Sequence, residues 1–265
     1  MLTNTRSDRV RSVQALSRRS MRSRTGFFVV EGPQAVREAL AHRPDHVRDI
    51  YVTSRAAARH GDLMSLATGA EARVHEVTEE VLAALCDTES PQGIVAVCRM
   101  LAVDLDGALD GLPPDAVVCV LTNVRDPGNA GTVIRGADAA GADLVLVSEA
   151  SVDIHNPKVV RSSAGSLFHL PIVAGLPIEQ ILSSLRARGV ALLATDGSGT
   201  TLLPDVDLTR PHAWVMGNEA WGLPATVRDA CDVVVRVPIH GLAESLNLAM
   251  AATLCLYESA RIRHG

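Results

Sequence analysis

Residues 116–135 read AVVCVLTNVRDPGNAGTVIR, and this stretch decides the fold. The six apolar residues 116–121 predict a buried strand, and the Pro-Gly pair in the polar loop that follows predicts a tight turn. The loop leads into a helix expected over 131–140, with Asn129 as its expected cap. A strand that turns into a helix is the repeating unit of a parallel α/β sheet, so we expect such a sheet here.

The same alternation continues to the end of the chain. Its strands are unbroken apolar runs, which is the pattern of strands covered on both faces of a parallel sheet. The expected strands are 116–121, 144–147, 170–173, 190–195, 213–216 and 233–237. The expected helices are 131–140, 178–187 and 245–261, with a short helix beginning at 159–163. Ligands of such sheets bind beyond the carboxyl ends of strands, so a site is expected in the loops after Leu121, Thr195, Met216 and Val237.

The first hundred residues alternate strands and helices more weakly and predict a smaller α/β domain. The expected strands are 26–30, 50–52, 74–77 and 93–99, and the expected helices are 34–41, 56–67 and 79–85. Residues 102–115 are acidic and rich in Gly and Pro, which is typical of a linker. We therefore expect an N-terminal domain over 1–101, a linker over 102–115 and a C-terminal domain over 116–265.

The charge of the chain is uneven. Of 265 residues 47% are hydrophobic, which excludes global disorder, and the net charge of −5 does not predict a general nucleic-acid binder. Residues 1–24 form a basic arm with Asp8 as its one acid. Its basic residues are Arg6, Arg9, Arg11, Arg18, Arg19, Arg22 and Arg24. The arm is either a local RNA contact or an ordinary solvated helix. Lys158 is the one lysine of the chain, so the frequent use of arginine can also reflect genome composition rather than selection for phosphate binding.

The cysteine and hydropathy patterns argue against several classes of protein. The five cysteines form no C-x-x-C pair and are odd in number, which argues against a zinc site and a disulfide framework and favours the cytoplasm. No apolar run reaches the roughly 18 residues of a membrane span, and the basic N-terminus lacks a signal-peptide core.

Two further loops carry polar residues where a strand has just ended. Residues 215–224 read VMGNEAWGLP, and a glycine turn alone would explain Gly217 and Gly222 but not Glu219. Residues 237–247 read VPIHGLAESLN and lead into an apolar helix. A buried amide without partners costs roughly 1–3 kcal/mol, so Asn247 there favours a functional site over simple capping by Ser245.

Taken together, the three loops resemble the SpoU/TrmH branch of RNA ribose 2′-O-methyltransferases in the SPOUT class. The pattern D-P-x-N-x-G-x-x-x-R is present as Asp126, Pro127, Asn129, Gly131 and Arg135. The pattern G-x-E-x-x-G is present as Gly217, Glu219 and Gly222, and the last pattern as Pro238, Ile239, Ser245, Leu246 and Asn247. Order and spacing match over about 116–265, with one departure at Asn123, where the family usually has an acid.

The resemblance implies transfer of a methyl group from S-adenosylmethionine to a ribose 2′-hydroxyl, with no metal. It implies that the cofactor is bound by Thr195, Gly217, Asn218, Val237, Ile239 and Leu246. It implies catalytic roles for Arg135, Asn129, Glu219, Ser245 and Asn247. Because a guanidinium stays protonated in proteins, we interpret Arg135 as a cation that stabilises the developing alkoxide rather than as a base.

The resemblance also implies architecture and partners. It implies a deep trefoil knot, although chains in general are unknotted, and a homodimer that packs through the helices expected over 245–261 and 131–140. The first hundred residues resemble a substrate-binding domain, through FVVEGP at 28–33 and QGIV at 92–95. Members with this domain modify ribosomal RNA, so 23S rRNA is the expected target, with a link to antibiotic resistance as one option. The expected RNA contacts are Arg18, Arg19, Arg22, Arg24, Arg125 and Arg161.

Three alternatives stay open at this point. One is a tRNA 2′-O-methyltransferase, and another is a ribosome-assembly factor that binds RNA without catalysis. The third is a doubly wound nucleotide-binding oxidoreductase, against which the missing glycine fingerprint after residues 116–121 argues.

Overall fold

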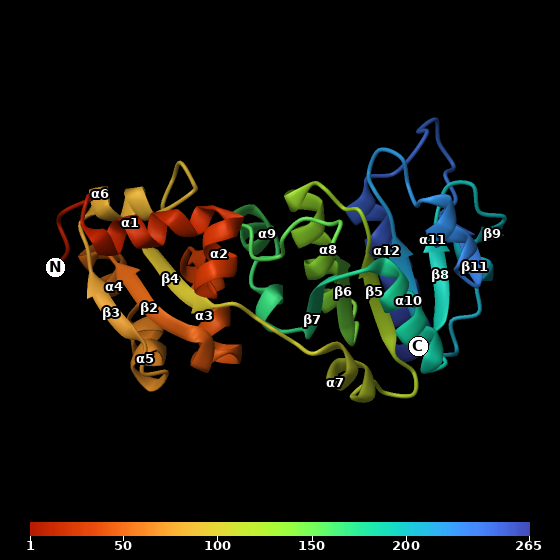
Figure 1. Ribbon diagram of the computed structural model, residues 1–265, viewed down its shortest axis with the longest axis horizontal. Coiled ribbons are helices and arrows are strands. Elements are labelled where there is room, and N and C mark those ends of the chain that lie inside the picture. The colour runs from red at the N-terminus through yellow and green to blue at the C-terminus, as the bar shows by residue number, and fades with distance from the viewer. The chain divides into compact units, whose positions relative to one another are not determined.

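The computed structural model describes residues 1–265 and divides into two compact units (Figure 1). Unit 1 comprises Met1–Leu101 and His155–His169, and unit 2 comprises Ala102–Ile154 and Leu170–Gly265. Each unit is α/β, as expected. No helix offers both the length and the hydropathy that a membrane span requires.

Unit 1 is built on a four-stranded mixed sheet in the order β1-β4-β2-β3. The strands are β1 (Phe27–Glu31), β2 (Val47–Val52), β3 (Arg73–Glu76) and β4 (Ile94–Arg99). The helices are α1 (Asp8–Gln14), α2 (Arg19–Thr25), α3 (Pro33–His42), α4 (Ser54–Arg59), α5 (Gly61–Gly69), α6 (Glu79–Leu85) and α9 (Pro157–Ser162). On one face, Val10 and Val13 of α1 pack with Val81 and Leu82 of α6 over the buried ring of Tyr51.

The helix predicted over 56–67 is two helices, α4 and α5. Thr53 caps α4 by accepting a hydrogen bond from the backbone N–H of Ala56. The chain leaves helical geometry at His60, where φ is −118° and ψ is 53°, and Gly61 then starts α5. Glycine has a low helix propensity, so ending the helix just before Gly61 costs little free energy.

The basic arm is helical, and one of its arginines lies inside unit 1. Arg22 of α2 is only 2% exposed, and its guanidinium donates hydrogen bonds to the backbone carbonyls of Leu16 (2.9 Å) and Ser17 (2.8 Å). The expectation that Arg22 contacts RNA is therefore wrong, because its donors are engaged with the chain's own backbone. Arg18, Arg19 and Arg24 are exposed.

Arg22→Ala is expected to lower the free energy of unfolding of unit 1 by about 2–3 kcal/mol, because two carbonyls would lose their partner in the interior. Urea unfolding followed by circular dichroism measures this loss. Arg19→Ala removes an exposed arginine of the same helix and should stay within about 0.5 kcal/mol of the parent chain. Equal effects of the two substitutions would contradict a structural role for Arg22.

Unit 2 is built on a seven-stranded parallel sheet in the order β7-β6-β5-β10-β8-β11-β9, which confirms the predicted parallel sheet. The strands are β5 (Val117–Leu121), β6 (Leu144–Ser148), β7 (Ile172–Leu176), β8 (Ala191–Thr195), β9 (Thr201–Leu202), β10 (His212–Met216) and β11 (Val233–Arg236). The helices are α7 (Leu105–Asp110), α8 (Pro127–Ala139), α10 (Ile178–Ala187), α11 (Ala225–Asp229) and α12 (Leu248–His264).

Helices cover both faces of this sheet, which explains its unbroken apolar strands. Residues of α7, α10 and α11 pack in one core with Val118, Val120 and other strand side chains of one face. On the other face α12 packs on β5, β10 and α8, and Ser259 of α12 accepts a hydrogen bond from the buried indole of Trp214 (2.8 Å).

Two stretches differ from the expected domain plan. The stretch 102–115 is predicted as a linker but contains α7, because Leu105 and Leu109 are buried in the unit 2 core. The stretch 155–169 is predicted inside the C-terminal domain but packs in unit 1. There Phe168 stacks with Phe28 at 6.3 Å, and the backbone N–H of Leu101 donates to the Nε2 atom of His155.

Candidate active site

The loops that follow β8, β10 and β11 enclose a cleft of about 500 Å³ at the carboxyl ends of these strands. This is the edge of the sheet at which the sequence places a site. The lining residues are Thr195, Asp196, Gly197, Met216, Gly217, Asn218, Glu219, Ala220, Gly222, Arg236, Val237, Ile239, Gly241, Ala243, Glu244, Ser245, Leu246, Leu248 and Ala251. All six residues predicted to bind a cofactor are among them, as are Glu219 and Ser245.

The loop after β10 folds back on itself into a compact turn. The backbone N–H of Asn218 donates to the carbonyl of Gly222 (2.9 Å), and the N–H of Gly222 donates to the carbonyl of Asn218 (3.0 Å). A Cβ atom at Gly217 would lie 2.5 Å from the carbonyl carbon and oxygen of Gly222, so only glycine fits. The side chain of Asn218 is buried and donates to the carbonyl of Asn123 (2.8 Å), which ties this loop to the loop after β5.

Asn123 itself has a φ of 58°. Asparagine tolerates this left-handed conformation better than most residues, and its carbonyl is the acceptor that Asn218 uses. The departure from the family pattern at this position therefore leaves the turn and its hydrogen bond in place.

A chain of side-chain hydrogen bonds joins the three sequence motifs. Asn247 Nδ2 donates to Asn129 Oδ1 (2.9 Å), and Asn129 Nδ2 donates to Glu219 Oε1 (3.3 Å). Glu219 also accepts from the backbone N–H of Asp126 (3.3 Å). Residues up to 118 positions apart in the sequence thus form one polar network beside the cleft.

The cap of α8 differs from the one expected, and the cap of α12 is not Ser245, the alternative to a functional role for Asn247. Asp126, not Asn129, caps α8, because its carboxylate accepts from the backbone N–H of Asn129 (2.7 Å) and the helix begins at Pro127. Asn247, not Ser245, caps α12, since its Oδ1 accepts from the N–H of Ala249 (2.9 Å). The helix predicted from 245 therefore begins at Leu248, and its capping residue also belongs to the network.

Asp196 is a lining residue that the sequence reasoning missed, although it directly follows the expected loop position Thr195. Burial tends to raise the pKa of Asp196, but hydrogen bonds from Ser198 and the backbone of Leu223, together with Arg228, hold that pKa below its ordinary value. The cleft therefore contains a carboxylate that is ionised at neutral pH.

Comparison with known proteins identifies the family. Residues 116–257 match the SpoU rRNA Methylase family, and residues 29–103 match the RNA 2′-O ribose methyltransferase substrate binding family. The chain belongs to the SpoU rRNA methylase family. This finding confirms the family that the three motifs resemble.

Full-length relatives of the SpoU family are similar to the chain. The 23S rRNA (guanosine-2′-O-)-methyltransferase RlmB of Bordetella pertussis is 37% identical over 240 residues, which are 89% of this chain and 98% of that protein. The 23S rRNA (guanosine(2553)-2′-O)-methyltransferase RlmP of Bacillus subtilis is 34% identical over 97% of both chains. The crystal structure of an AdoMet-bound rRNA methyltransferase from Sinorhizobium meliloti is 29% identical, has a TM-score of 0.88, and covers 100% of this chain and 98% of that one.

Three arginines of this SpoU chain lie outside the cleft lining. Arg135 is exposed on α8, and Arg125 is exposed in the loop before that helix. Arg161 of α9 belongs to unit 1, where its guanidinium lies 3.6 Å from Asp87 and 3.9 Å from Glu31. Two acids next to Arg161 reduce the charge that it can offer to a phosphate.

Proposed function

We propose that the protein transfers a methyl group from S-adenosylmethionine to a ribose 2′-hydroxyl of 23S rRNA. The observation that carries this proposal is the cleft of unit 2, where all six residues predicted to bind the cofactor converge from three loops. The relatives that support it are named 23S rRNA 2′-O-methyltransferases and match nearly the whole chain.

The cleft suits this cofactor in size and in chemistry. A volume of about 500 Å³ lies within the range of small-molecule sites. Its wall has an apolar part, formed by Met216, Ile239 and Leu246, against which an adenine ring can pack. The carboxylate of Asp196 is an acceptor for the polar groups of the cofactor, and backbone groups of the turn 217–222 that the turn's own hydrogen bonds do not use are further partners. When bound, S-adenosylmethionine supplies a methyl group on a positively charged sulfur.

The residues of the three motifs have distinct proposed roles. Arg135 is a permanent cation that binds the phosphate next to the target ribose and stabilises negative charge on its 2′-oxygen. The Asn247–Asn129–Glu219 network fixes the loops of the three motifs relative to one another, because each amide is both donor and acceptor. Ser245 lines the cleft, and its proposed role is to orient the ribose hydroxyl.

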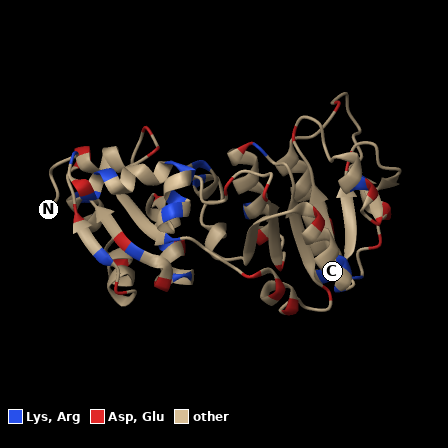
Figure 2. Ribbon diagram, in the orientation of Figure 1, with Lys and Arg blue, Asp and Glu red and all other residues tan.

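Unit 1 is proposed as the domain that binds the RNA. Its helices α1 and α2 carry five arginines, Arg9, Arg11, Arg19, Arg22 and Arg24, although the net charge of the chain is −5; Figure 2 colours the Lys and Arg residues. Arg18, Arg19 and Arg24 are exposed there and are proposed phosphate contacts, as is Arg125 of unit 2. An rRNA substrate would place the protein in the cytoplasm.

Primer extension at low nucleotide concentration tests the proposed reaction, since a ribose 2′-O-methyl group stalls reverse transcriptase under these conditions. We expect one additional stop on 23S rRNA from cells that carry the gene, absent from cells that lack it. The same stop should be absent when the gene encodes Arg135→Ala. Identical ladders with and without the gene would contradict rRNA as the substrate.

We also propose a homodimer that packs through α12. Three large apolar side chains, Met250, Leu254 and Tyr257, are half exposed at the spacing of one helix face. Sedimentation at micromolar concentration should show a dimer, and Leu254→Glu should shift it to monomer because a charge would be buried in the contact. Leu66→Glu, on an exposed position of α5, is the matched control and should remain dimeric. A monomeric parent chain would contradict this proposal.

We also propose the trefoil knot that the resemblance to the family implies. The last helix of the chain, α12, packs on β5 and β10 in the middle of the sheet rather than on a strand at its edge. After β11 the chain thus returns across the central strands of the sheet, which is a course that a threaded C-terminal segment would take.

A further inference from the structure

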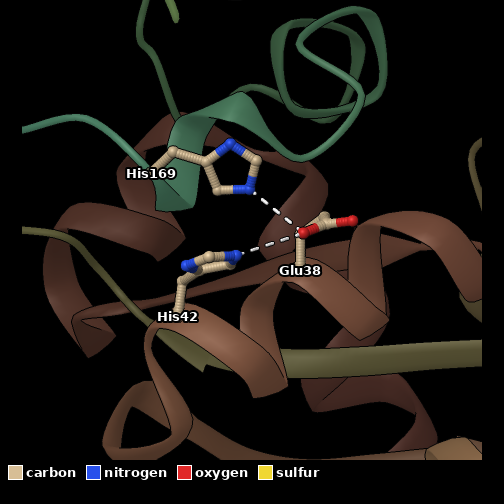
Figure 3. A group of neighbouring side chains, drawn as sticks. All are labelled: Glu38, His42 and His169. Carbon is tan, nitrogen blue, oxygen red and sulfur yellow. Dashed lines mark hydrogen bonds and ion pairs between the residues drawn. The ribbon is translucent and has the colours of Figure 1, made fainter.

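Unit 1 contains a group of two imidazoles and one carboxylate that methyl transfer does not use. Glu38 and His42 lie one turn apart on α3, and His169 follows α9 on the segment 155–169 (Figure 3). The Nε2 atom of His169 lies 3.1 Å from Glu38 Oε2, and the Nε2 atom of His42 lies 3.4 Å from the same oxygen. Both rings thus direct a nitrogen at one carboxylate oxygen.

The surroundings of Glu38 fix its carboxylate in this position. Gln34 Nε2 donates to the other oxygen, Oε1, at 2.6 Å, so Oε2 is the oxygen left to the two imidazoles. Gly165 admits the side chain, because a Cβ atom there would lie 2.4 Å from the Cγ atom of Glu38. The Glu38 side chain is 18% exposed, while those of His169 and His42 are 27% and 49% exposed, so the carboxylate is largely shielded and a small ion can enter from the side of His42.

The three atoms suit a divalent transition-metal ion. Zinc bonds to histidine nitrogen and carboxylate oxygen measure about 2.0–2.2 Å, so tetrahedral ligands stand roughly 3.3–3.5 Å apart. The distances of 3.1 and 3.4 Å from the two imidazole nitrogens to Glu38 Oε2 are close to this ligand–ligand distance. All three ligand atoms lie within 4.8 Å of one another. Two imidazoles favour zinc over magnesium or calcium, which prefer oxygen ligands.

We infer that Glu38, His42 and His169 form a zinc site, with water as the fourth ligand. The ion would replace the hydrogen bond of His169 and the ion-pair contact of His42 to Oε2 by direct bonds, and it would join α3 to the segment 155–169. That segment is far from α3 in sequence and carries Lys158 and Arg161. The site therefore orders a basic segment of unit 1, and it does not depend on the proposed methyl transfer.

Calorimetric titration of the full chain with Zn²⁺, after treatment with EDTA, tests the site. We expect one ion per chain and a higher midpoint of thermal unfolding with zinc than without it. His42→Ala and His169→Ala should each weaken binding by more than the roughly 10–100-fold cost of losing an outer-shell partner. His46→Ala is the matched control, because His46 is a half-buried histidine beside a single acid, Asp45, and its removal should leave the affinity unchanged.

Glu38→Gln separates a zinc site from a simple ion pair, because glutamine keeps the hydrogen-bonding shape without the charge. We expect this variant to fold without zinc as the parent chain does and to lose the zinc-dependent rise in unfolding midpoint. In the parent chain, zinc should also slow hydrogen exchange of the amides in 155–169, and His169→Ala should abolish that effect. Zinc affinity equal in the parent chain and all three variants, or no binding to the parent chain, would overturn the inference.

Discussion

Replacing Arg135 with alanine is expected to abolish methyl transfer while leaving the affinity for S-adenosylmethionine within severalfold of the parent chain. The side chain is exposed on α8 and does not line the cleft, so its loss removes no cofactor contact. Its proposed role is to stabilise charge that develops on the ribose oxygen. Removal of one such group from an active site costs about 10²–10³ in rate.

Transfer of tritiated methyl groups to rRNA measures the rate, and calorimetry with S-adenosylhomocysteine measures cofactor-site affinity. Arg210→Ala removes another exposed arginine of unit 2, paired with Asp207, and serves as the control that should keep full activity. Arg135→Lys keeps the positive charge but loses the planar fork, so we expect partial activity. Turnover of Arg135→Ala close to that of the parent chain would remove Arg135 from the mechanism.

Most elements of the parallel sheet could be predicted from the sequence because its strands are covered on both faces. Unbroken apolar runs such as 117–121 and 213–216 leave a strong signal even without an alignment. The two-residue strand β9 has no such run and pairs only with β11, so it escaped prediction. The linker assignment failed at α7 because Asp104 and Asp106, which make 102–115 look like a linker, are here a helix cap and a first-turn acid.

The site was predictable as a set of loops but not as a set of contacts. Glycines and polar residues directly after apolar runs identify loops at one edge of a sheet, and the cleft lies there. The bond between Asn247 and Asn129 spans 118 positions, and its existence depends on α8 and α12 packing side by side. The burial of Arg22 was equally hidden, because charge alone predicts a solvent-exposed arginine and only the fold brings two carbonyls to it.

Replacing Gly217 with alanine is expected to weaken binding of S-adenosylmethionine more than any other single methyl addition in the cleft. The added Cβ atom would lie 2.5 Å from the carbonyl carbon and oxygen of Gly222 and 2.7 Å from the backbone nitrogen of Leu223. These are main-chain atoms that cannot rotate away, so the turn 217–222 has to open. Overpacking of this kind costs about 1–3 kcal/mol, and if that cost falls on binding it equals roughly 5- to 150-fold in affinity.

The same substitution distinguishes a preformed turn from one that the ligand shapes. Opening the turn would break the paired backbone hydrogen bonds between Asn218 and Gly222, and it would release Glu219 from the Asn129 network. Methyl transfer should therefore fall even at cofactor concentrations that saturate the variant. Gly111→Ala, outside the cleft with its nearest neighbour at 3.6 Å, should change neither quantity. Full activity of Gly217→Ala at saturating cofactor would mean that the turn can be rebuilt by the ligand and that its backbone bonds do not govern the reaction.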